Sequence, residues 1–187
     1  MNMEGRKHGP WTINSSEEIY EDPWIKVKRD LVTRPDGNPG TYSTVHLKSG
    51  VCVIALDQDG NVHLTREFHY AVGRYTIEGV SGGIEEGESR ELAATRELAE
   101  ELGLSAESWT HLGTIDPFTA AIYSEVDLFL AESLTQSEAN PEGTEEIEHV
   151  VHSFQEAVAM VKDGTITHAP TCVALLRVAL ERADLLS

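Results

Sequence analysis

The sequence is poor in cysteine, in aromatic residues and in positive charge. It has 2 cysteines among 187 residues, 6% aromatic residues, and 14 Lys and Arg against 32 Asp and Glu, which gives a formal net charge of −18. The shortage of cations argues against non-specific binding of nucleic acid or of an anionic membrane, because both require Lys and Arg to displace counterions. The shortage of cysteine excludes a disulfide-rich scaffold. We therefore expect neither nucleic acid nor membrane among its partners.

Long apolar runs are also missing. The run from Val51 to Leu56 is far too short to cross a bilayer, which takes about 20 residues. Residues 1–8 are polar and lack the apolar stretch of a secretory signal. Cys52 and Cys172 lie among apolar neighbours, which predicts buried free thiols in a reducing compartment rather than a disulfide or a metal pair. These features predict a cytoplasmic protein.

Apolar residues make up 40% of the sequence, which is enough for one full hydrophobic core. Alternating apolar and polar residues in the first half predict strands, and helical periodicity appears in the second half. The strands are expected over residues 24–32, 41–47, 51–56, 62–68, 75–80, 109–115, 126–131 and 147–151. The helices are expected over residues 89–102, 153–162 and 170–185, and the polar stretch 132–143 is expected to be a loop. The sum is a single α+β domain over residues 1–187, a mixed sheet with helices packed on it.

Acidic residues gather on one face of the first expected helix. At about 100° per residue, Glu97, Glu100 and Glu101 share a face, while apolar residues such as Leu98 and Leu102 lie opposite. Like charges four residues apart destabilise a bare helix, and a divalent cation converts that repulsion into coordination. Carboxylate oxygens suit Mg²⁺ or Mn²⁺. The alternative is an ordinary solvated acidic helix face.

The complete spacing favours the metal site over the solvated face. Gly82 is followed by Glu88, then by Arg96-Glu97-Leu98-Ala99-Glu100-Glu101-Leu102-Gly103-Leu104. This run reproduces G-x5-E-x7-R-E-U-x-E-E-x-G-U, where U is aliphatic, without a departure. The chain therefore strongly resembles the Nudix hydrolase family, which implies an α/β/α sandwich and metal-dependent hydrolysis of a nucleoside diphosphate linked to another group.

The resemblance implies roles for the residues of this box. The metal ligands are expected to be Glu97 and Glu101, Glu100 directly or through water, and the carbonyl of Ser81. Arg96 is expected to pair with the box carboxylates and hold them in place. Three further residues are expected to shape the motif: Gly82, Glu88 and Gly103. The bound Mg²⁺, or Mn²⁺, would neutralise the diphosphate and orient the attacking water.

Segments outside the box resemble the branch of this family that hydrolyses ADP-ribose and nucleoside-diphosphate sugars. They are residues 21–27, 34–37, 73–83 and 164–176. This likeness implies a homodimer, in which residues 1–47 form N-terminal strands that complete the partner's site and residues 48–187 form the catalytic core. Two positions depart from the branch, because His69 stands where an arginine is usual and Ala120 stands where ADP-ribose enzymes carry a proline. A broader nucleotide-sugar preference is therefore expected.

The residue that activates water and the residues that bind substrate are less sharply defined. The resemblance points to Glu145 or Glu146 as the base, with Glu125 and the box residue Glu100 as alternatives. A solvated loop is the competing interpretation for Glu145 and Glu146. Substrate candidates just before the box are Arg66, Arg74 and Glu78, since arginine suits bidentate phosphate contact. Trp24 is either a stacking platform for a base or a core residue.

Three functions remain open on the sequence. The first is Mg²⁺-dependent hydrolysis of a nucleoside-diphosphate sugar to a nucleoside monophosphate and a sugar phosphate. The second is hydrolysis of a dinucleoside polyphosphate or a nucleoside triphosphate by the same chemistry. The third is a sensor that binds a nucleotide sugar without cleaving it. A zinc site is not expected, because His149 and His152 are three apart in a predicted strand and therefore point to opposite faces.

Overall fold

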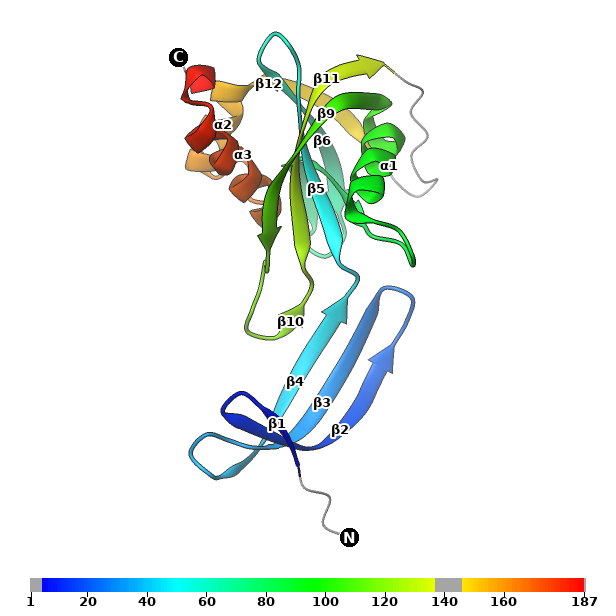
Figure 1. Cartoon of the computed structure of the whole chain (residues 1–187), viewed down its shortest axis with the longest axis vertical. Helices are drawn as coiled ribbons and strands as arrows, with labels where there is room; N and C mark the ends of the chain where they lie inside the picture. The colour runs from blue at the N-terminus through cyan, green and yellow to red at the C-terminus, as the bar shows by residue number, and fades with distance from the viewer. Residues whose placement is uncertain (1–4, 137–145, 187) are drawn as a thin grey trace. The chain divides into compact units, whose positions relative to one another are not determined.

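A computed structural model of the chain describes residues 5–136 and 146–186. The chain forms two compact units, one made of Met1–Lys48 with Phe118–Ser124, the other of Ser49–Pro117 with Glu125–Ser187. Each unit has its own sheet, and all the helices belong to the second (Figure 1). None of the helices in the described part of the chain is long and apolar enough to cross a membrane.

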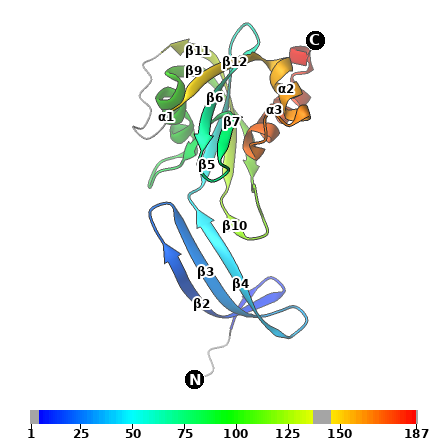
Figure 2. The same cartoon turned by 180° about the vertical axis from the view of Figure 1, so that it is seen from behind.

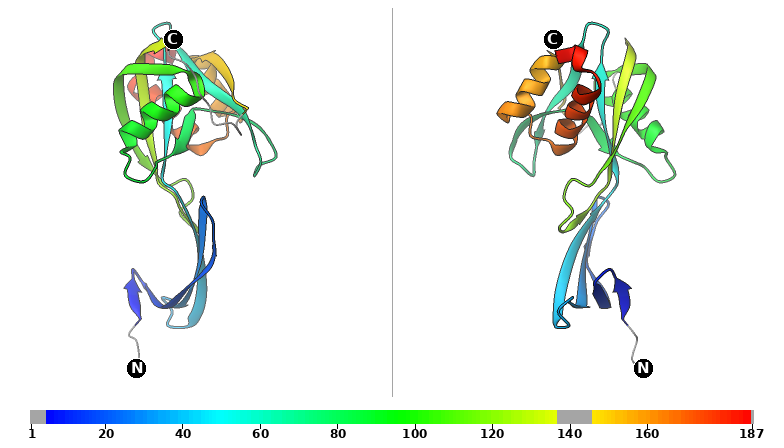
Figure 3. Two further views of the ribbon diagram at one scale, coloured as in Figure 1. Left: turned by 90° about the vertical axis from the view of Figure 1, so that its right-hand side faces the viewer. Right: turned by 60° about the vertical axis from the view of Figure 1, so that its left-hand side comes forward.

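The N-terminal unit is a five-stranded sheet with the order β1-β2-β3-β4-β10. Its strands are β1 (Arg6–His8), β2 (Trp11–Glu21), β3 (Ile25–Thr33), β4 (Pro39–Leu47) and β10 (Ile122–Tyr123). The first four pair antiparallel, and β10 pairs parallel to β4. This sheet curves along its length (Figure 3). The predicted strands 24–32 and 41–47 are β3 and β4, whereas β2 was not predicted because its sequence is largely polar and exposed.

The second unit is a mixed sheet with the order β12-β6-β5-β11-β9, to which β7 adds beside β6 and β8 beside β5. Its strands are β5 (Gly50–Leu56), β6 (Asn61–His69), β7 (Arg74–Glu78), β8 (Val80–Gly83), β9 (Leu104–Ile115), β11 (Val126–Gln136) and β12 (Glu148–Ser153). Strands β5 and β11 are parallel, and the other pairs are antiparallel. Strands β6 and β7 lie side by side as a hairpin (Figure 2).

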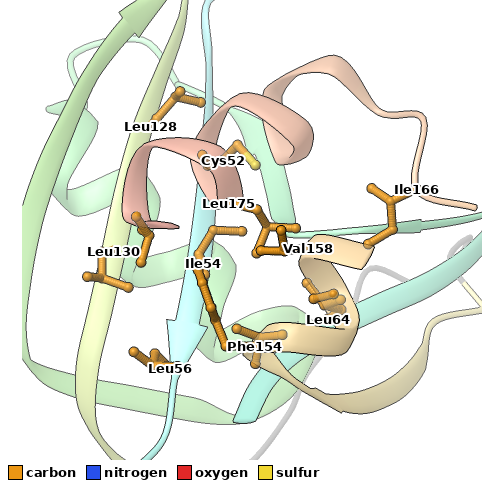
Figure 4. Close-up of a cluster of buried hydrophobic side chains, with 14 residues drawn as sticks. Cys52, Ile54, Leu56, Leu64, Leu128, Leu130, Phe154, Val158, Ile166 and Leu175 are labelled. Atoms are coloured by element: carbon orange, nitrogen blue, oxygen red, sulfur yellow. The ribbon is translucent and has the colours of Figure 1, made fainter. Parts of the chain in front are cut away.

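Helices cover both faces of this sheet. Helix α1 (Arg90–Leu102) packs on one face, and α2 (Phe154–Asp163) and α3 (Ala169–Glu181) pack on the other (Figure 1). Alternation along β5 feeds both cores, since Val51, Val53 and Ala55 contact the α1 cluster while Cys52, Ile54 and Leu56 belong to the α2–α3 cluster (Figure 4). The architecture is the predicted α+β sandwich with helices on both sides of a sheet.

The structure departs from the predicted boundaries in four places. The strand predicted over 75–80 is divided at Gly79, because β7 pairs with β6 and β8 pairs with β5. Strand β9 begins at Leu104, not 109, and β11 continues to Gln136, into the predicted loop. Helix α3 ends at Glu181 and is followed by the 3-10 turn η1 (Ala183–Leu186). The extensions of β9 and β11 pair with each other, so tertiary pairing outweighs their polar sequence.

Candidate active site

Helix α1 carries the acidic face, and its two ends are fixed by local hydrogen bonds. The Ser89 hydroxyl accepts the backbone N–H of Leu92 at 3.2 Å, which caps the N-terminus. Gly103 closes the C-terminus at φ 61°, in the left-handed region that favours glycine, and donates its N–H to the carbonyl of Ala99. The apolar side docks on the sheet through buried residues: Ala93, Ala94, Leu98 and Leu102. Caps and core together fix the direction in which the carboxylates project.

Arg96 lies at the centre of the charged groups on this helix. Its guanidinium makes a bidentate contact with Glu88, through Nε to Oε1 at 2.9 Å and Nη2 to Oε2 at 3.0 Å. Nη1 donates to Glu97 Oε1 at 2.7 Å and to Glu100 Oε2 at 3.0 Å, and Nη2 also donates to the carbonyl of Gly83 at 2.9 Å. One arginine thus joins the glycine-rich loop to two carboxylates of the helix.

The network favours the charged form of both Glu88 and Arg96, because it lowers the pKa of the acid and raises the pKa of the base. Hydrogen bonds from Arg96 are the main reason that the pKa of Glu88 falls from 4.5 to about 2, and the backbone N–H of Glu85 adds to the effect. The hydrogen bond to Glu88 in turn raises the pKa of Arg96 above its usual value. The Glu88–Arg96 pair therefore stays charged throughout the neutral range.

The loop before α1 approaches the helix closely. A Cβ on Gly82 would overlap the carboxylate of Glu97, so a larger residue here would push that carboxylate aside. The backbone N–H of Ser81 donates to Glu101 Oε1 at 3.3 Å, and the Ser81 hydroxyl donates to the carbonyl of Gly79 at 2.7 Å. The loop and the acidic face are consequently in direct contact, as the spacing of the motif requires.

The donor set suits a hard divalent cation. Glu97, Glu100 and Glu101 offer carboxylate oxygens on one helix face, and Ser81 lies beside Glu101. Among residues 5–136 and 146–186, no three His, Cys, Asp or Glu side chains are arranged around a common metal position. In this arrangement Glu97 and Glu100 are turned toward Arg96. The Glu97 side chain is 12% exposed and that of Glu100 is 35% exposed, so each carboxylate reaches the edge of the solvent with one oxygen on Arg96.

The candidate bases are less well defined by the structure. Glu146 and Glu125 are both exposed, and the backbone carbonyl of Glu125 accepts the N–H of Gly50 at 2.8 Å. Glu145 lies outside the described residues. Glu100 lies within the box, 35% exposed and bound to Arg96. Among the three candidates that the structure describes, none is singled out by its position for proton transfer.

The substrate candidates lie on the β6–β7 hairpin but on different faces. In its register, Glu78 and Arg74 lie on the same face as His69, whereas Arg66 lies on the other. Arg66 pairs with Glu148 at 2.7 Å and stacks over Tyr75, with 4.2 Å from Cζ to the ring centroid. Of the three substrate candidates on this hairpin, Arg74 and Glu78 therefore share a face on which one ligand could contact both, and Arg66 does not.

Glu78 is the most enclosed of these groups. Its side chain is 12% exposed, its carboxylate accepts from the Thr76 hydroxyl at 2.6 Å, and its oxygens lie 3.1 Å from His69 Nε2 and 3.1 Å from His168 Nδ1. Sequence reasoning did not single out His168, because neither its spacing nor its neighbours mark it. Trp24 is 73% exposed, so the alternative that it is a core residue is wrong.

Comparisons with known proteins identify family domains along most of the chain. Residues 46–172 match the profile of the NUDIX domain, and residues 11–45 match that of the nucleoside diphosphate sugar hydrolase N-terminal domain. An ADP-ribose pyrophosphatase of Mycobacterium tuberculosis is 28% identical over 167 residues, 88% of this chain and 81% of that protein. One from Bacillus subtilis is 27% identical over 173 residues, 90% of this chain and 92% of that protein.

Two more comparisons extend the picture. An ADP-sugar pyrophosphatase of Mus musculus is 36% identical over 110 residues, which are 53% of this chain and 50% of the mouse protein. A crystal structure of an ADP compounds hydrolase superposes with a TM-score of 0.82 at 22% identity, covering 93% of this chain and 95% of that chain. At that identity the superposition bears on the fold, and it confirms the predicted sandwich.

Proposed function

The chain belongs to the NUDIX family, and we propose that it hydrolyses the diphosphate bond of a nucleoside-diphosphate sugar, releasing a nucleoside monophosphate and a sugar phosphate. The observation that carries the proposal is the acidic face of α1. Glu97, Glu100 and Glu101 share that face, and Arg96 and the Ser81 N–H hold their carboxylates beside the glycine-rich loop. A merely solvated helix face would not need such a set of partners.

Each residue of the box then has a task. Mg²⁺, or Mn²⁺ in its place, would be held by Glu97, Glu100, Glu101 and the Ser81 carbonyl, and would supply charge neutralisation to the diphosphate. Arg96 keeps two of these carboxylates oriented and fastens the helix to Glu88 in the loop. The water is activated by a glutamate, for which Glu145, Glu146, Glu125 and Glu100 are the candidates.

Substrate binding has to overcome the acidity of the chain. A diphosphate is repelled by a net charge of −18, so cations near the site carry much of its binding. Arg74 contributes one such cation, with Nη2 only 2.8 Å from Thr167 Oγ1. On the same face of the hairpin, the Glu78 carboxylate can accept from sugar hydroxyls, and the His69 ring can contact hydroxyls or phosphates. The names of the relatives favour ADP-ribose or another ADP-sugar, and His69 in place of arginine favours a broader range.

We also propose that the chain works as a cytoplasmic homodimer. The two cysteines are free thiols, Cys52 buried and Cys172 half-buried, which agrees with a reducing compartment. The N-terminal unit exposes large apolar side chains, among them Trp24, Tyr20 and Leu31, and residues 11–45 match an N-terminal domain of nucleoside diphosphate sugar hydrolases. A second copy of the chain is the partner proposed for that surface.

The test is a substrate screen combined with a matched pair of variants. Purified protein is assayed with ADP-ribose, ADP-glucose, GDP-mannose, UDP-glucose, CoA and dinucleoside polyphosphates, with and without Mg²⁺. Glu101→Gln is expected to lower turnover about 10³-fold, because it removes a metal-binding charge and each 1.4 kcal/mol of lost transition-state stabilisation is a factor of ten. Glu107→Gln, an exposed change on β9, is the control and should retain turnover.

The outcomes separate the three candidate functions. Cleavage of sugar nucleotides with loss of activity in Glu101→Gln supports the proposal. Preferential cleavage of dinucleoside polyphosphates or nucleoside triphosphates keeps the site and changes the substrate. Binding without cleavage of any compound would favour the sensor and contradict the hydrolase.

A further inference from the structure

The chain changes its pairing partner at Gly79, just before the metal-binding loop. Strand β7 pairs with β6 up to Glu78, and β8 pairs with β5 from Val80 onward. Gly79 lies between the two ladders and against β5, where a Cβ would stand 2.8 Å from the carbonyl of Val53 and 3.2 Å from Cys52 Sγ. No larger residue fits there without displacing backbone. The position of Ser81, two residues further on, therefore depends on how Gly79 is held.

Thr171 of helix α3 holds Gly79 from the opposite side of the sheet to α1. Its side chain is fully buried, at 0% exposure, and its hydroxyl accepts the backbone N–H of Gly79 at 2.8 Å. Because Gly79 contributes to neither ladder, this contact is the bond that the structure gives its buried amide. A buried N–H that loses its acceptor bears the cost of desolvation, about 1–3 kcal/mol. The hydrogen bond from Gly79 to Thr171 therefore stabilises this part of the chain independently of the apolar packing of α3.

Polar neighbours from three segments of the chain surround the Thr171 hydroxyl. His168 Nδ1 lies 3.1 Å from Glu78 Oε2 and 2.8 Å from Thr171 Oγ1. The Thr171 hydroxyl, which accepts the N–H of Gly79, also lies 3.7 Å from Cys52 Sγ. These contacts hold the Thr171 oxygen beside the Gly79 amide.

We propose that Thr171 is a positioning residue for the metal site, acting through Gly79 on the Ser81 carbonyl and on the Ser81 N–H that holds Glu101. Thr171, which is in contact with His168, holds the Gly79 amide where the chain passes from β7 to β8. The Ser81 hydroxyl also donates to the Gly79 carbonyl at 2.7 Å, so Gly79 is hydrogen-bonded both to Thr171 and to the loop that carries Ser81. This inference rests on the metal site proposed above.

The test measures metal affinity without substrate. Thr171→Val keeps the shape of the side chain and removes the acceptor, whereas Thr171→Ser keeps the hydroxyl. We expect Thr171→Val to bind Mn²⁺ about tenfold more weakly, as measured by calorimetry or by the spin resonance of free Mn²⁺, because removing a group that orients a ligand costs about that much. The amide of Gly79 should exchange its hydrogen faster in the same variant. Thr171→Ser should stay close to wild type in both measurements.

The controls separate positioning from a general loss of stability. Thr135→Val makes the same chemical change on the exposed part of β11 and should leave Mn²⁺ binding unchanged. If Thr171→Val does not fold, Thr171→Cys, with a weaker acceptor of similar size, should show an intermediate loss. Wild-type Mn²⁺ affinity in a folded Thr171→Val or Thr171→Cys, or an equal loss in Thr171→Ser, would overturn the inference. Failure of the wild-type protein to bind Mn²⁺ would instead contradict the metal site itself.

Discussion

The two units of this chain differ sharply in how much they bury. Among the described residues, the N-terminal unit has two buried apolar side chains, Ile13 and Val32, and the second unit has all the others. The N-terminal sheet leaves large apolar groups exposed, with Trp24 at 73%, Tyr20 at 52% and Leu31 at 51%. The second unit instead packs helices on both faces of its sheet.

This difference shows that the two units are stabilised in different ways. In the second unit, apolar burial on both faces of β5 supplies the dominant favourable term. In the N-terminal unit, long antiparallel ladders hold the strands together, and ion pairs such as Lys26 with Glu21 at 2.6 Å add little at an exposed surface. A hollow of about 670 Å³, lined in part by Trp11, Tyr42 and Tyr123, lies in the same unit. Its apolar lining is open to a partner, whereas the main apolar clusters of the second unit are already covered by its helices.

The largest expected effect comes from a core substitution in the second unit. Leu98 is fully buried between α1 and the sheet, and Leu98→Ala should lower the free energy of unfolding by about 3–4 kcal/mol through lost burial and a residual cavity. Leu31→Ala, the matched change on the N-terminal sheet, should change it by about 0.5 kcal/mol or less at protein concentrations too low for two copies to associate. Urea unfolding followed by circular dichroism measures both. Equal losses in the two variants would contradict the contrast between the units.

The next effect concerns the exposed surface of the N-terminal unit. Leu31→Glu places a charge among the apolar side chains that are proposed to meet a second copy. The dissociation constant of the dimer should therefore rise by at least about tenfold. Analytical ultracentrifugation over a range of protein concentrations measures the shift. The exposed change Glu107→Gln on β9 is the control. A wild-type protein that is monomeric at tens of micromolar would contradict the proposed dimer.

The smallest effect sharpens the account of the second unit's charged network. Because the pKa of Glu88 is lowered to about 2, its stabilising contribution is complete above its unfolded value of 4.5 and is lost as the pH falls toward about 2. Glu88→Gln should cost about 1 kcal/mol at pH 7, and the difference from wild type should shrink as the pH falls below 5. Urea unfolding at several pH values measures this. A difference that grows toward low pH would contradict the sign of the shift.

Local sequence was sufficient to predict α1 and its ends. Ser89 and Gly103 cap the helix as expected of a hydroxyl and a glycine at these positions, and Ser153 with Glu156 forms a capping box at the start of α2. Strands β1 and β2 were missed, because polar residues give no alternation and only pairing with a neighbour makes them strands. The division of 75–80 into β7 and β8 was missed for the same reason.

The contacts of Arg96 with Glu97 and Glu100 follow from helical spacing and agree with the role that the resemblance implied, whereas its contacts with Glu88 and the Gly83 carbonyl need the folded loop. Arg66 and Arg74 look equivalent in the sequence, yet the register of β6 and β7 places them on opposite faces of the hairpin. Strand pairing alone decided which of the two can share a ligand with Glu78.

The sequence by itself determined the low cation content, the acidic face of α1 and the spacing of the box, because each of these is a property of residues close together in the chain. Only the tertiary structure decided that Glu78, Gly79, His168 and Thr171 form one buried network, since α3 follows Gly79 by ninety residues of chain and meets it only through the sheet. Periodicity encodes which face of an element is apolar. Which distant groups satisfy a buried amide is decided only when that face is packed.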